Sequence, residues 1–274
     1  MIKKIIKYAL DEDLKHIGDV TSKAIFNSEE NVFVLFSKEY GILCGSEIFR
    51  QVYESINKNI KIKFYFNDGD KISKGDKIAE ISGRTSFILQ GERTALNFIS
   101  HLSGIASKTN QFVQKAGSKT KILDTRKTIP GLRELQKYAV NCGSGTNHRI
   151  GLYDMIMIKD NHIDGVGSIT EAVKRIRKKW KHKYKIEVET RNLKEVKEAL
   201  NCNVDIIMLD NMNIETMKKA VNIINKKAYV EASGNITLDR VEEVSNTGVD
   251  FISVGELTHT VKAFDFSLVK QNLK

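Results

Sequence analysis

The sequence has only three cysteines and one proline, and it contains no long apolar run. Cys44, Cys142 and Cys202 stand far apart, in neither a Cys-x-x-Cys pair nor a zinc-ligand spacing, so reduced thiols with structural roles are expected. No apolar stretch approaches the roughly 18 residues of a membrane span, and the lysine-rich first residues lack the apolar core of a signal peptide. These absences predict a cytoplasmic protein without a membrane segment.

The composition is that of an ordinary globular protein. Its 274 residues are 41% hydrophobic and 28% charged, which is too apolar for a disordered chain and enough for a barrel-sized domain with a smaller companion. The net charge of +10 favours anionic partners, nucleic acid among them. Much of the excess lies in residues 174–183, where lysine and arginine interrupt a helical apolar pattern, and this stretch is interpreted as a solvated helix surface.

The first third of the chain mixes short strands, turns and helices. Gly69-Asp70-Lys71-Ile72 and Gly75-Asp76-Lys77-Ile78 form a small repeat in which Gly-Asp pairs separate brief β segments. A helix is predicted from Gln90, because apolar residues then recur every three or four positions. Arg93 would lie in its first turn, where a cation opposes the helix dipole, so Glu92 compensates this charge or the charge is used elsewhere.

Beyond residue 120, short apolar runs alternate with helical segments. The expected strands are residues 121–123, 155–158, 184–188, 205–209, 228–230 and 251–254. This alternation predicts a parallel sheet with right-handed crossovers. A dinucleotide-binding open sheet is disfavoured, because Gly143-Ser144-Gly145 lacks the third glycine and the preceding strand of a Gly-x-Gly-x-x-Gly turn. An α/β fold of the (β/α) barrel type is therefore predicted.

A polar or small residue follows each expected strand. These residues are Asp124, Lys159, Glu189, Asp210, Ser233 and Gly255. The last four are 21, 23 and 22 positions apart, about the length of one β/α unit. Because such barrels carry their chemistry at the carboxyl ends of the strands, all six are expected at one rim.

Several cations belong to this predicted rim. Arg126 and Lys127 precede a loop marked by Pro130-Gly131, His148 and Arg149 follow a glycine-rich turn, and Lys159 ends an apolar strand. Taken alone, the Arg126-Lys127 segment is equally well explained as a solvated basic loop, and an isolated His148-Arg149 pair is better explained as a core histidine beside a surface arginine. Together they predict a cationic cluster, and the planar fork of arginine suits a substrate with two carboxylates.

Acidic and small residues complete the rim. Glu189 and Asp210 are suited to ribose hydroxyls, to Mg²⁺ held through a diphosphate, or to positive charge that develops as a glycosidic bond breaks. The late loops, residues 231–237 and 253–258, have small residues that let backbone N–H groups approach a phosphate. Each loop alone is a weak signal, since glycine after a strand is usually a turn.

The sequence resembles the quinolinate phosphoribosyltransferases, also called carboxylating nicotinate-nucleotide pyrophosphorylases, over almost its whole length. The motifs run in the family's order: Gly18-Asp19-Val20-Thr21, Glu92-Arg93-Thr94-Ala95-Leu96-Asn97, Leu102-Ser103-Gly104-Ile105-Ala106, Asp124-Thr125-Arg126-Lys127-Thr128, Asn147-His148-Arg149, Ile158-Lys159-Asp160-Asn161-His162, Glu187-Val188-Glu189, Leu209-Asp210-Asn211 and Ser253-Val254-Gly255. The resemblance implies an open α/β barrel over residues 104–261. It also implies a smaller N-terminal α/β sandwich, residues 1–103, on which the tail 262–274 packs.

The resemblance also implies the reaction. Quinolinate and phosphoribosyl pyrophosphate would give nicotinate mononucleotide, pyrophosphate and carbon dioxide in NAD biosynthesis, with Mg²⁺ as cofactor. The protein would be a homodimer with shared sites, and Arg93 would reach the neighbouring subunit's pocket. No nucleic-acid or membrane partner is implied.

Residue roles carry over by motif. The implied quinolinate cluster is Arg126, Lys127, His148, Arg149 and Lys159. The carboxylates on the ribose and metal side are Glu189 and Asp210, and with Lys127 and Lys159 they form the expected catalytic set. The remaining substrate-binding residues are Thr125, Ser233, Gly234, Asn235, Val254, Gly255 and Glu256.

The chain departs from the family pattern at four positions. Ser144 and Asn235 stand where glycine is usual, Thr190 where an aliphatic residue is common, and Glu256 where a small residue is common. Glu256 matters most, because an added carboxylate near a phosphate loop weakens anion binding unless it points outward.

Two other functions are considered. One is a related phosphoribosyltransferase that acts on another anionic base. The other is a non-catalytic nucleic-acid binder explained by the charge of +10, which would show salt-sensitive affinity and no release of pyrophosphate. The second is disfavoured, because Glu189 and Asp210 would lie within its binding face.

Overall fold

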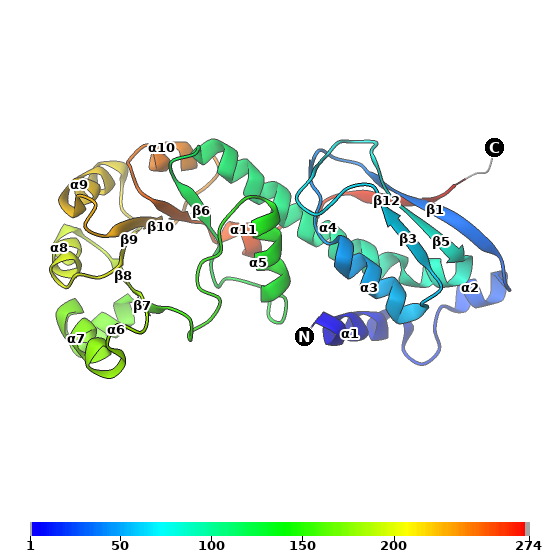
Figure 1. Cartoon of the computed structure of the whole chain (residues 1–274), viewed down its shortest axis with the longest axis horizontal. Coiled ribbons are helices and arrows are strands. Elements are labelled where there is room, and N and C mark those ends of the chain that lie inside the picture. The colour runs from blue at the N-terminus through cyan, green and yellow to red at the C-terminus, as the bar shows by residue number, and fades with distance from the viewer. Residues whose placement is uncertain (1, 272–274) are drawn as a thin grey trace. The chain divides into compact units, whose positions relative to one another are not determined.

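The computed structural model describes residues 2–271 and divides into two compact units (Figure 1). Unit 1 comprises Met1–Lys108, Pro130–Ser144 and Val261–Lys274, and unit 2 comprises Thr109–Ile129 and Gly145–Thr260. Unit 1 thus includes Pro130–Ser144, which the sequence analysis assigned to the barrel domain. Residue 1 and residues 272–274 of the expected N-terminal domain and tail lie outside the described residues.

Unit 1 is built on a four-stranded antiparallel sheet with the order β12-β1-β5-β3. Its strands are β1 Glu30–Ser37, β3 Lys61–Phe64, β5 Lys77–Arg84 and β12 Phe266–Lys270. The Gly-Asp repeat lies at short strands as predicted, with β4 Lys71–Ile72 pairing with β2 Gly41–Ile42. Strand β12 pairs with β1, so residues 266–270 return to the first unit.

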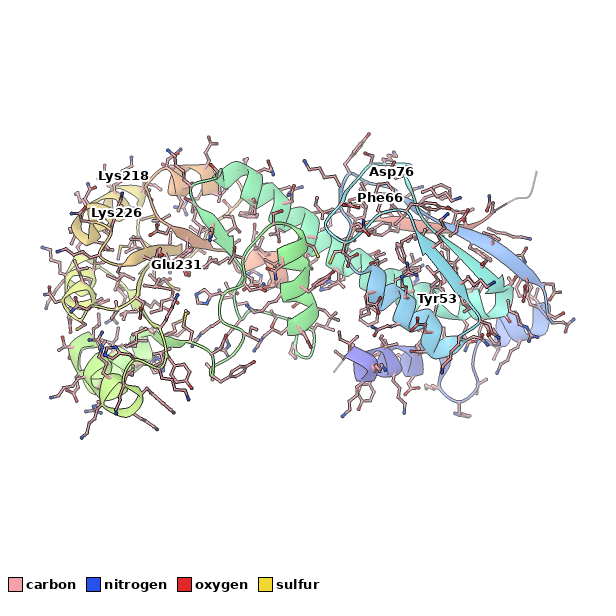
Figure 2. The ribbon with its side chains drawn as sticks, viewed as in Figure 1. Tyr53, Phe66, Asp76, Lys218, Lys226 and Glu231 are labelled. Atoms are coloured by element: carbon pink, nitrogen blue, oxygen red, sulfur yellow. The ribbon has the colours of Figure 1, made fainter. Side chains whose placement is uncertain are left out.

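Helices α1 Ile2–Leu14, α2 Val20–Ile25, α3 Ser46–Ile56 and α5 Arg133–Cys142 also belong to unit 1. The core includes Tyr53 (labelled in Figure 2), whose ring centroid lies 5.2 Å from that of Phe49 on the same helix α3. Burial of two aromatic side chains contributes strongly to such a small core.

Helix α4, Thr85–Ala116, begins one turn earlier than predicted. Ile88 is fully buried, so the apolar face extends upstream of Gln90. Arg93 therefore lies in the helix interior and is exposed to solvent, and the predicted clash with the helix dipole was wrong.

Unit 2 is a six-stranded sheet with the order β6-β11-β10-β9-β8-β7, in which every pair is parallel. The strands are β6 Lys121–Leu123, β7 Ile156–Ile158, β8 Ile186–Thr190, β9 Ile206–Asp210, β10 Tyr229–Ser233 and β11 Phe251–Ser253. All six expected strands are confirmed. Because the edge strands β6 and β7 do not pair with each other within residues 2–271, the barrel is open, and the predicted fold class is confirmed.

Helices separate the strands of unit 2. They are α6 Asp160–Val166, α7 Ile169–Trp180, α8 Leu193–Asn201, α9 Ile214–Ile224, α10 Val241–Ser245 and α11 Glu256–His259. Ser168 caps α7 by accepting the Glu171 backbone N–H at 3.1 Å. Helix α7 buries Ile169, Ala172 and Val173 and ends in basic residues, so the lysine-rich stretch is a solvated surface as interpreted. Among residues 2–271, no helix is both long and apolar enough to cross a membrane.

Candidate active site

A pocket of about 710 Å³ opens at the carboxyl ends of the parallel strands of unit 2. All predicted site residues except Arg93, which lies in unit 1, line it: Thr125, Arg126, Lys127, His148, Arg149, Lys159, Glu189, Asp210, Ser233, Gly234, Asn235, Val254, Gly255 and Glu256. The barrel topology explains this convergence, because parallel strands bring their carboxyl ends to one edge of the sheet.

Asp124 is the exception among the six residues expected at the rim. Its side chain is fully buried, and its carboxylate accepts hydrogen bonds from Asn147 Nδ2 at 2.6 Å and from the His148 backbone N–H at 2.8 Å. Asp124 follows the end of β6 at the predicted edge of the sheet, but its side chain is buried, joins the loop after β6 to the His148 segment and is not among the pocket-lining residues.

Two arginines form the basic part of the pocket. Burial and the nearby charge of Arg126 lower the pKa of Arg149, so the two guanidinium groups repel each other. Arg149 Nη1 donates to the Met155 carbonyl at 3.3 Å, while Arg126 Nε is buried and donates to no acceptor within residues 2–271. This arrangement favours binding of an anion with more than one negative group.

Lys159 and Glu189, which both line the pocket, form an ion pair. Lys159 Nζ donates to Glu189 Oε2 at 2.7 Å, and the side chains are 44% and 13% exposed. An ion pair this accessible to solvent contributes little to stability. Lys159 can therefore exchange this partner for a carboxylate of a bound ligand.

The base of the pocket contains a buried cluster of His148, Glu187 and Glu231. His148 Nε2 lies 3.1 Å from Glu187 Oε2 and 3.3 Å from Glu231 Oε2, and the side chains are 6%, 0% and 0% exposed. Glu231, labelled in Figure 2, belongs to β10, whereas Glu187 belongs to β8. The two glutamates are far apart in the sequence and meet only through the strand order, in which β8 and β10 are the two neighbours of β9.

The protonation of this cluster follows from its contacts. Burial opposes a charge on His148, but the two carboxylates outweigh it and raise the pKa of the imidazole to about 10. Burial and the charge of Glu231 raise the pKa of Glu187. The Arg149 backbone N–H donates to His148 Nδ1 at 2.7 Å, so we assign the proton of the neutral ring to Nε2. The further proton that the raised pKa values retain is shared by His148, Glu187 and Glu231.

Comparison with known proteins identifies the family. Residues 19–103 match the model of the N-terminal domain of quinolinate phosphoribosyl transferase, and residues 105–269 match the model of its C-terminal domain. The chain belongs to the quinolinate phosphoribosyltransferase family.

Relatives of this family match nearly the whole chain. A chloroplastic nicotinate-nucleotide pyrophosphorylase (carboxylating) of Arabidopsis thaliana is 44% identical, covering 97% of the chain and 82% of the relative. A probable enzyme of the same name from Bacillus subtilis (strain 168) is 42% identical over 97% of the chain and 92% of its own length. The structure of the nicotinate-nucleotide pyrophosphorylase from Francisella tularensis has a TM-score of 0.95 and 42% identity, covering 98% of this chain and 96% of that one.

Backbone geometry accounts for the family's preference for glycine at two positions. Ser144 and Asn235 have φ values of +67° and +51°, in the left-handed region that glycine adopts without cost. Asparagine tolerates this region well, and Asn235 Nδ2 donates to Asn211 Oδ1 at 3.1 Å. At the adjacent Gly234 (φ +96°), an added Cβ would lie 2.2 Å from Asn211 Oδ1, so this loop requires glycine there.

The other two departures are also located. Thr190 is buried, and its hydroxyl donates to the Met208 carbonyl at 2.8 Å, so a polar residue is satisfied where quinolinate phosphoribosyltransferases commonly have an aliphatic one. Glu256 lines the pocket beside Gly255. Glu256 therefore lies among the pocket-lining residues, where its negative charge adds to those of Glu189 and Asp210.

Sequence reasoning did not assign several residues that form the pocket. They are Met157, Met208, Asn211, Glu231, Ile236, Thr237, Ser253 and His259, with Glu187 buried below. One signal was available: Glu187 and Glu231 are charged residues inside otherwise apolar strand runs, and such residues are rarely buried without a partner. Their pairing with His148 depends on strand order, which composition and periodicity do not give.

The residues present fit Mg²⁺ only as a partial site. Among residues 2–271, two clusters of three side chains are close enough to hold a metal ion together. One is Cys44, Asp68 and Cys142, and the other is His148, Glu187 and Glu231. Neither cluster includes Glu189 or Asp210. Asp210 Oδ2 accepts from Asn211 Nδ2 at 2.9 Å and retains a second oxygen. Mg²⁺ is commonly bound through one or two carboxylates together with substrate phosphates, which this donor set allows.

Proposed function

We propose that this chain transfers the phosphoribosyl group of phosphoribosyl pyrophosphate to quinolinate, and releases pyrophosphate and carbon dioxide to form nicotinate mononucleotide for NAD biosynthesis. The observation that carries the proposal is a single pocket lined both by the cations Arg126, Arg149 and Lys159 and by the carboxylates Glu189 and Asp210. The names of the relatives, carboxylating nicotinate-nucleotide pyrophosphorylases, support the same reaction.

Quinolinate binding would use the cations of the pocket. Its two carboxylates would relieve the repulsion between Arg126 and Arg149 and give Arg126 Nε an acceptor. Thr125 and Lys127 lie at the same rim, where the Thr125 hydroxyl accepts the Lys127 backbone N–H at 3.0 Å. This rim would orient the ring nitrogen toward the sugar, and such positioning supplies much of the rate enhancement in a reaction between two bound substrates.

The carboxylates of the pocket would act on the sugar. The ring nitrogen attacks the anomeric carbon as the bond to pyrophosphate breaks, and Glu189 or Asp210 stabilises the positive charge that develops on the ribose. The product is a pyridinium, whose ring accepts the electron pair left when the adjacent carboxylate departs as carbon dioxide. A proton from solvent then replaces it, so no covalent enzyme intermediate is required.

The late loops would hold phosphate groups. Gly234 and Asn235 follow β10 in the left-handed conformation, and Val254 and Gly255 follow β11. Successive backbone N–H groups in such turns form concave sites for anions. When bound, Mg²⁺ neutralises charge on the diphosphate, and Glu189 and Asp210 would hold it together with the diphosphate oxygens.

Assembly and location belong to the same proposal. The protein would be a cytoplasmic homodimer in which the exposed Arg93 of one subunit completes the quinolinate site of the other. Some plant relatives are named as chloroplastic or mitochondrial, so location differs within the family.

The direct test incubates purified protein with quinolinate, phosphoribosyl pyrophosphate and Mg²⁺. Nicotinate mononucleotide, pyrophosphate and carbon dioxide are expected in equal amounts, and Arg149→Ala is expected to abolish them. Nicotinate and other pyridine carboxylates serve as competing acceptors. Faster turnover of one of these than of quinolinate would assign the site to a different anionic base.

A further inference from the structure

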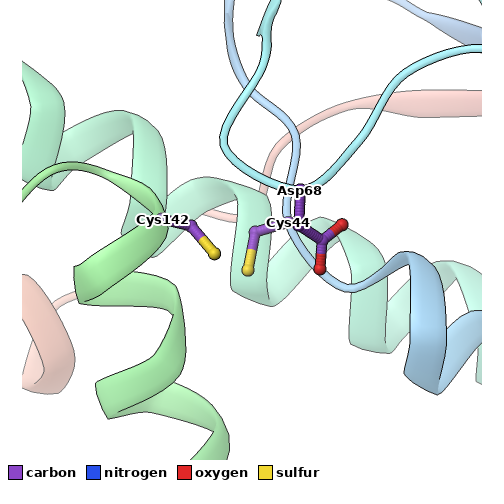
Figure 3. A group of neighbouring side chains, drawn as sticks. All are labelled: Cys44, Asp68 and Cys142. Atoms are coloured by element: carbon purple, nitrogen blue, oxygen red, sulfur yellow. The ribbon is translucent and has the colours of Figure 1, made fainter.

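Two cysteines that are remote in sequence meet in unit 1. Cys44 lies between β2 and α3, and Cys142 is the last residue of α5. Their sulfur atoms and a carboxylate oxygen of Asp68 all lie within 4.8 Å of one another (Figure 3). Both cysteines are free thiols. The pocket chemistry uses neither of them.

Asp68 already has a structural task. Its carboxylate accepts the backbone N–H groups of Gly45 at 2.9 Å and Ser46 at 3.0 Å, which caps α3, and it accepts the Tyr138 hydroxyl at 3.0 Å. Three hydrogen bonds leave this carboxylate poorly suited to hold a metal. The groups that remain available for chemistry are the two thiols.

The thiols differ in accessibility and acidity. Cys44 is fully buried, whereas Cys142 is half-buried and reachable from solvent. A hydrogen bond between them lowers the pKa of Cys142, with the Tyr138 hydroxyl adding to this effect, and raises the pKa of Cys44. Cys142 is therefore the group that an oxidant reaches first, and Cys44 is placed to react second.

We propose that Cys44 and Cys142 form a reversible disulfide whose closure weakens quinolinate binding in the barrel of unit 2. The effect on quinolinate binding rests on the proposed function. A peroxide is the oxidant: the Cys142 thiolate attacks one oxygen and becomes a sulfenic acid as the O–O bond breaks. The Cys44 thiol then attacks that sulfur and expels water. Two thiols give up two electrons and two protons, and the peroxide is reduced to two waters. A dithiol reverses the reaction by exchange.

Formation of the disulfide requires Cys44 or Cys142 to move. The sulfurs lie up to 4.8 Å apart, and a disulfide requires about 2.05 Å. Cys44 is held firmly, because its backbone N–H and carbonyl both bond to Ser103 Oγ, at 2.9 and 3.0 Å. The end of α5 at Cys142 is therefore expected to move, together with the turn at Ser144, whose left-handed backbone is already strained.

The chain transmits that movement to the pocket. Residues Pro130–Ser144 belong to unit 1, but in the sequence they connect two segments that line the pocket of unit 2. Lys127 precedes them, and His148 and Arg149 follow them. Thr146 lies between the turn and the pocket, where it pairs with Leu123 of β6. Displacement of about 1 Å at an anion-binding arginine is enough to impair catalysis substantially. The oxidised protein is expected to show a KM for quinolinate raised about fivefold to tenfold, with a smaller change for phosphoribosyl pyrophosphate.

The test uses the full chain, reduced and then treated with hydrogen peroxide. Intact mass should fall by two hydrogens, and a peptide linking Cys44 to Cys142 should appear and vanish again with dithiothreitol. C44S and C142S should not form the link, and C202S, which lies outside the pair, should form it normally. A sulfinic acid at Cys142, or a link to Cys202, overturns the proposal.

Kinetics test the coupling. The KM for quinolinate should rise on oxidation of the wild type and of C202S, return after reduction, and stay constant in C44S. A mapped disulfide with an unchanged KM for quinolinate overturns the coupling. The peptide map does not depend on activity, so it tests the disulfide even in an inactive protein. Absence of phosphoribosyl transfer by the reduced protein would contradict the proposed function and not the disulfide.

Discussion

His148 Nε2 lies 3.1 Å from Glu187 Oε2, so a ring at the pocket floor is held from beneath by a buried carboxyl group. Its other nitrogen, Nδ1, accepts the backbone N–H of Arg149. Both nitrogens are thus engaged by the protein. This geometry favours a role for His148 in positioning Arg149. The resemblance had implied instead that His148 contacts quinolinate directly.

His148→Ala is expected to raise the KM for quinolinate by about tenfold, because the backbone N–H of Arg149 loses its acceptor and the guanidinium group loses its fixed position. The KM for phosphoribosyl pyrophosphate should change much less. Steady-state kinetics with each substrate varied in turn provides the measurement. Equal increases in both KM values would argue for general disruption of the pocket.

Glu231→Gln is expected to flatten the dependence of stability on pH. The proton that His148 shares with Glu187 and Glu231 is held up to a folded pKa of about 10, above the unfolded value of the imidazole. Its contribution to stability is therefore fully present below the unfolded pKa and is lost as pH rises through the folded one. The melting temperature of the wild type should therefore fall between about pH 7 and 10, more steeply than that of the variant. Glu242→Gln, an exposed substitution on α10, is the control and should follow the wild type. Parallel curves for all three proteins would contradict the assignment.

Arg93→Ala and Arg149→Ala should each abolish activity, and mixing the two proteins should restore part of it. In a dimer with shared sites, the mixed species holds one site that has both arginines intact. The measurement is nicotinate mononucleotide formation after subunit exchange is demonstrated by native mass spectrometry. Exchanged but inactive mixtures would exclude Arg93 from the partner's pocket.

Glu256→Gln is expected to lower the KM for phosphoribosyl pyrophosphate about twofold to fivefold, because a carboxyl group that lines the pocket beside Gly255 opposes anion binding. The difference from wild type should shrink at high ionic strength. Glu243→Gln on the exposed face of α10 is the matched control. An increased KM would show that Glu256 instead assists binding.

The fold was largely predictable from local pattern. Short apolar runs alternating with helical segments predicted all six strands of unit 2, and polar residues at their ends predicted most of the pocket. Parallel topology makes strand ends converge, so this inference needed no coordinates. The start of α4 was misplaced, because Phe87, Ile88 and Leu89, directly before Gln90, are a continuous apolar run that shows no helical period by itself.

Residue types and their spacing by themselves determined the strands, the barrel and the cations at its mouth. Only the tertiary structure decided which side chains meet: Glu187 with Glu231 through strand order, and Cys44 with Cys142 through the return of α5 to unit 1. The physical reason is that periodicity records which face of an element is buried. It carries no information about which distant segment covers that face.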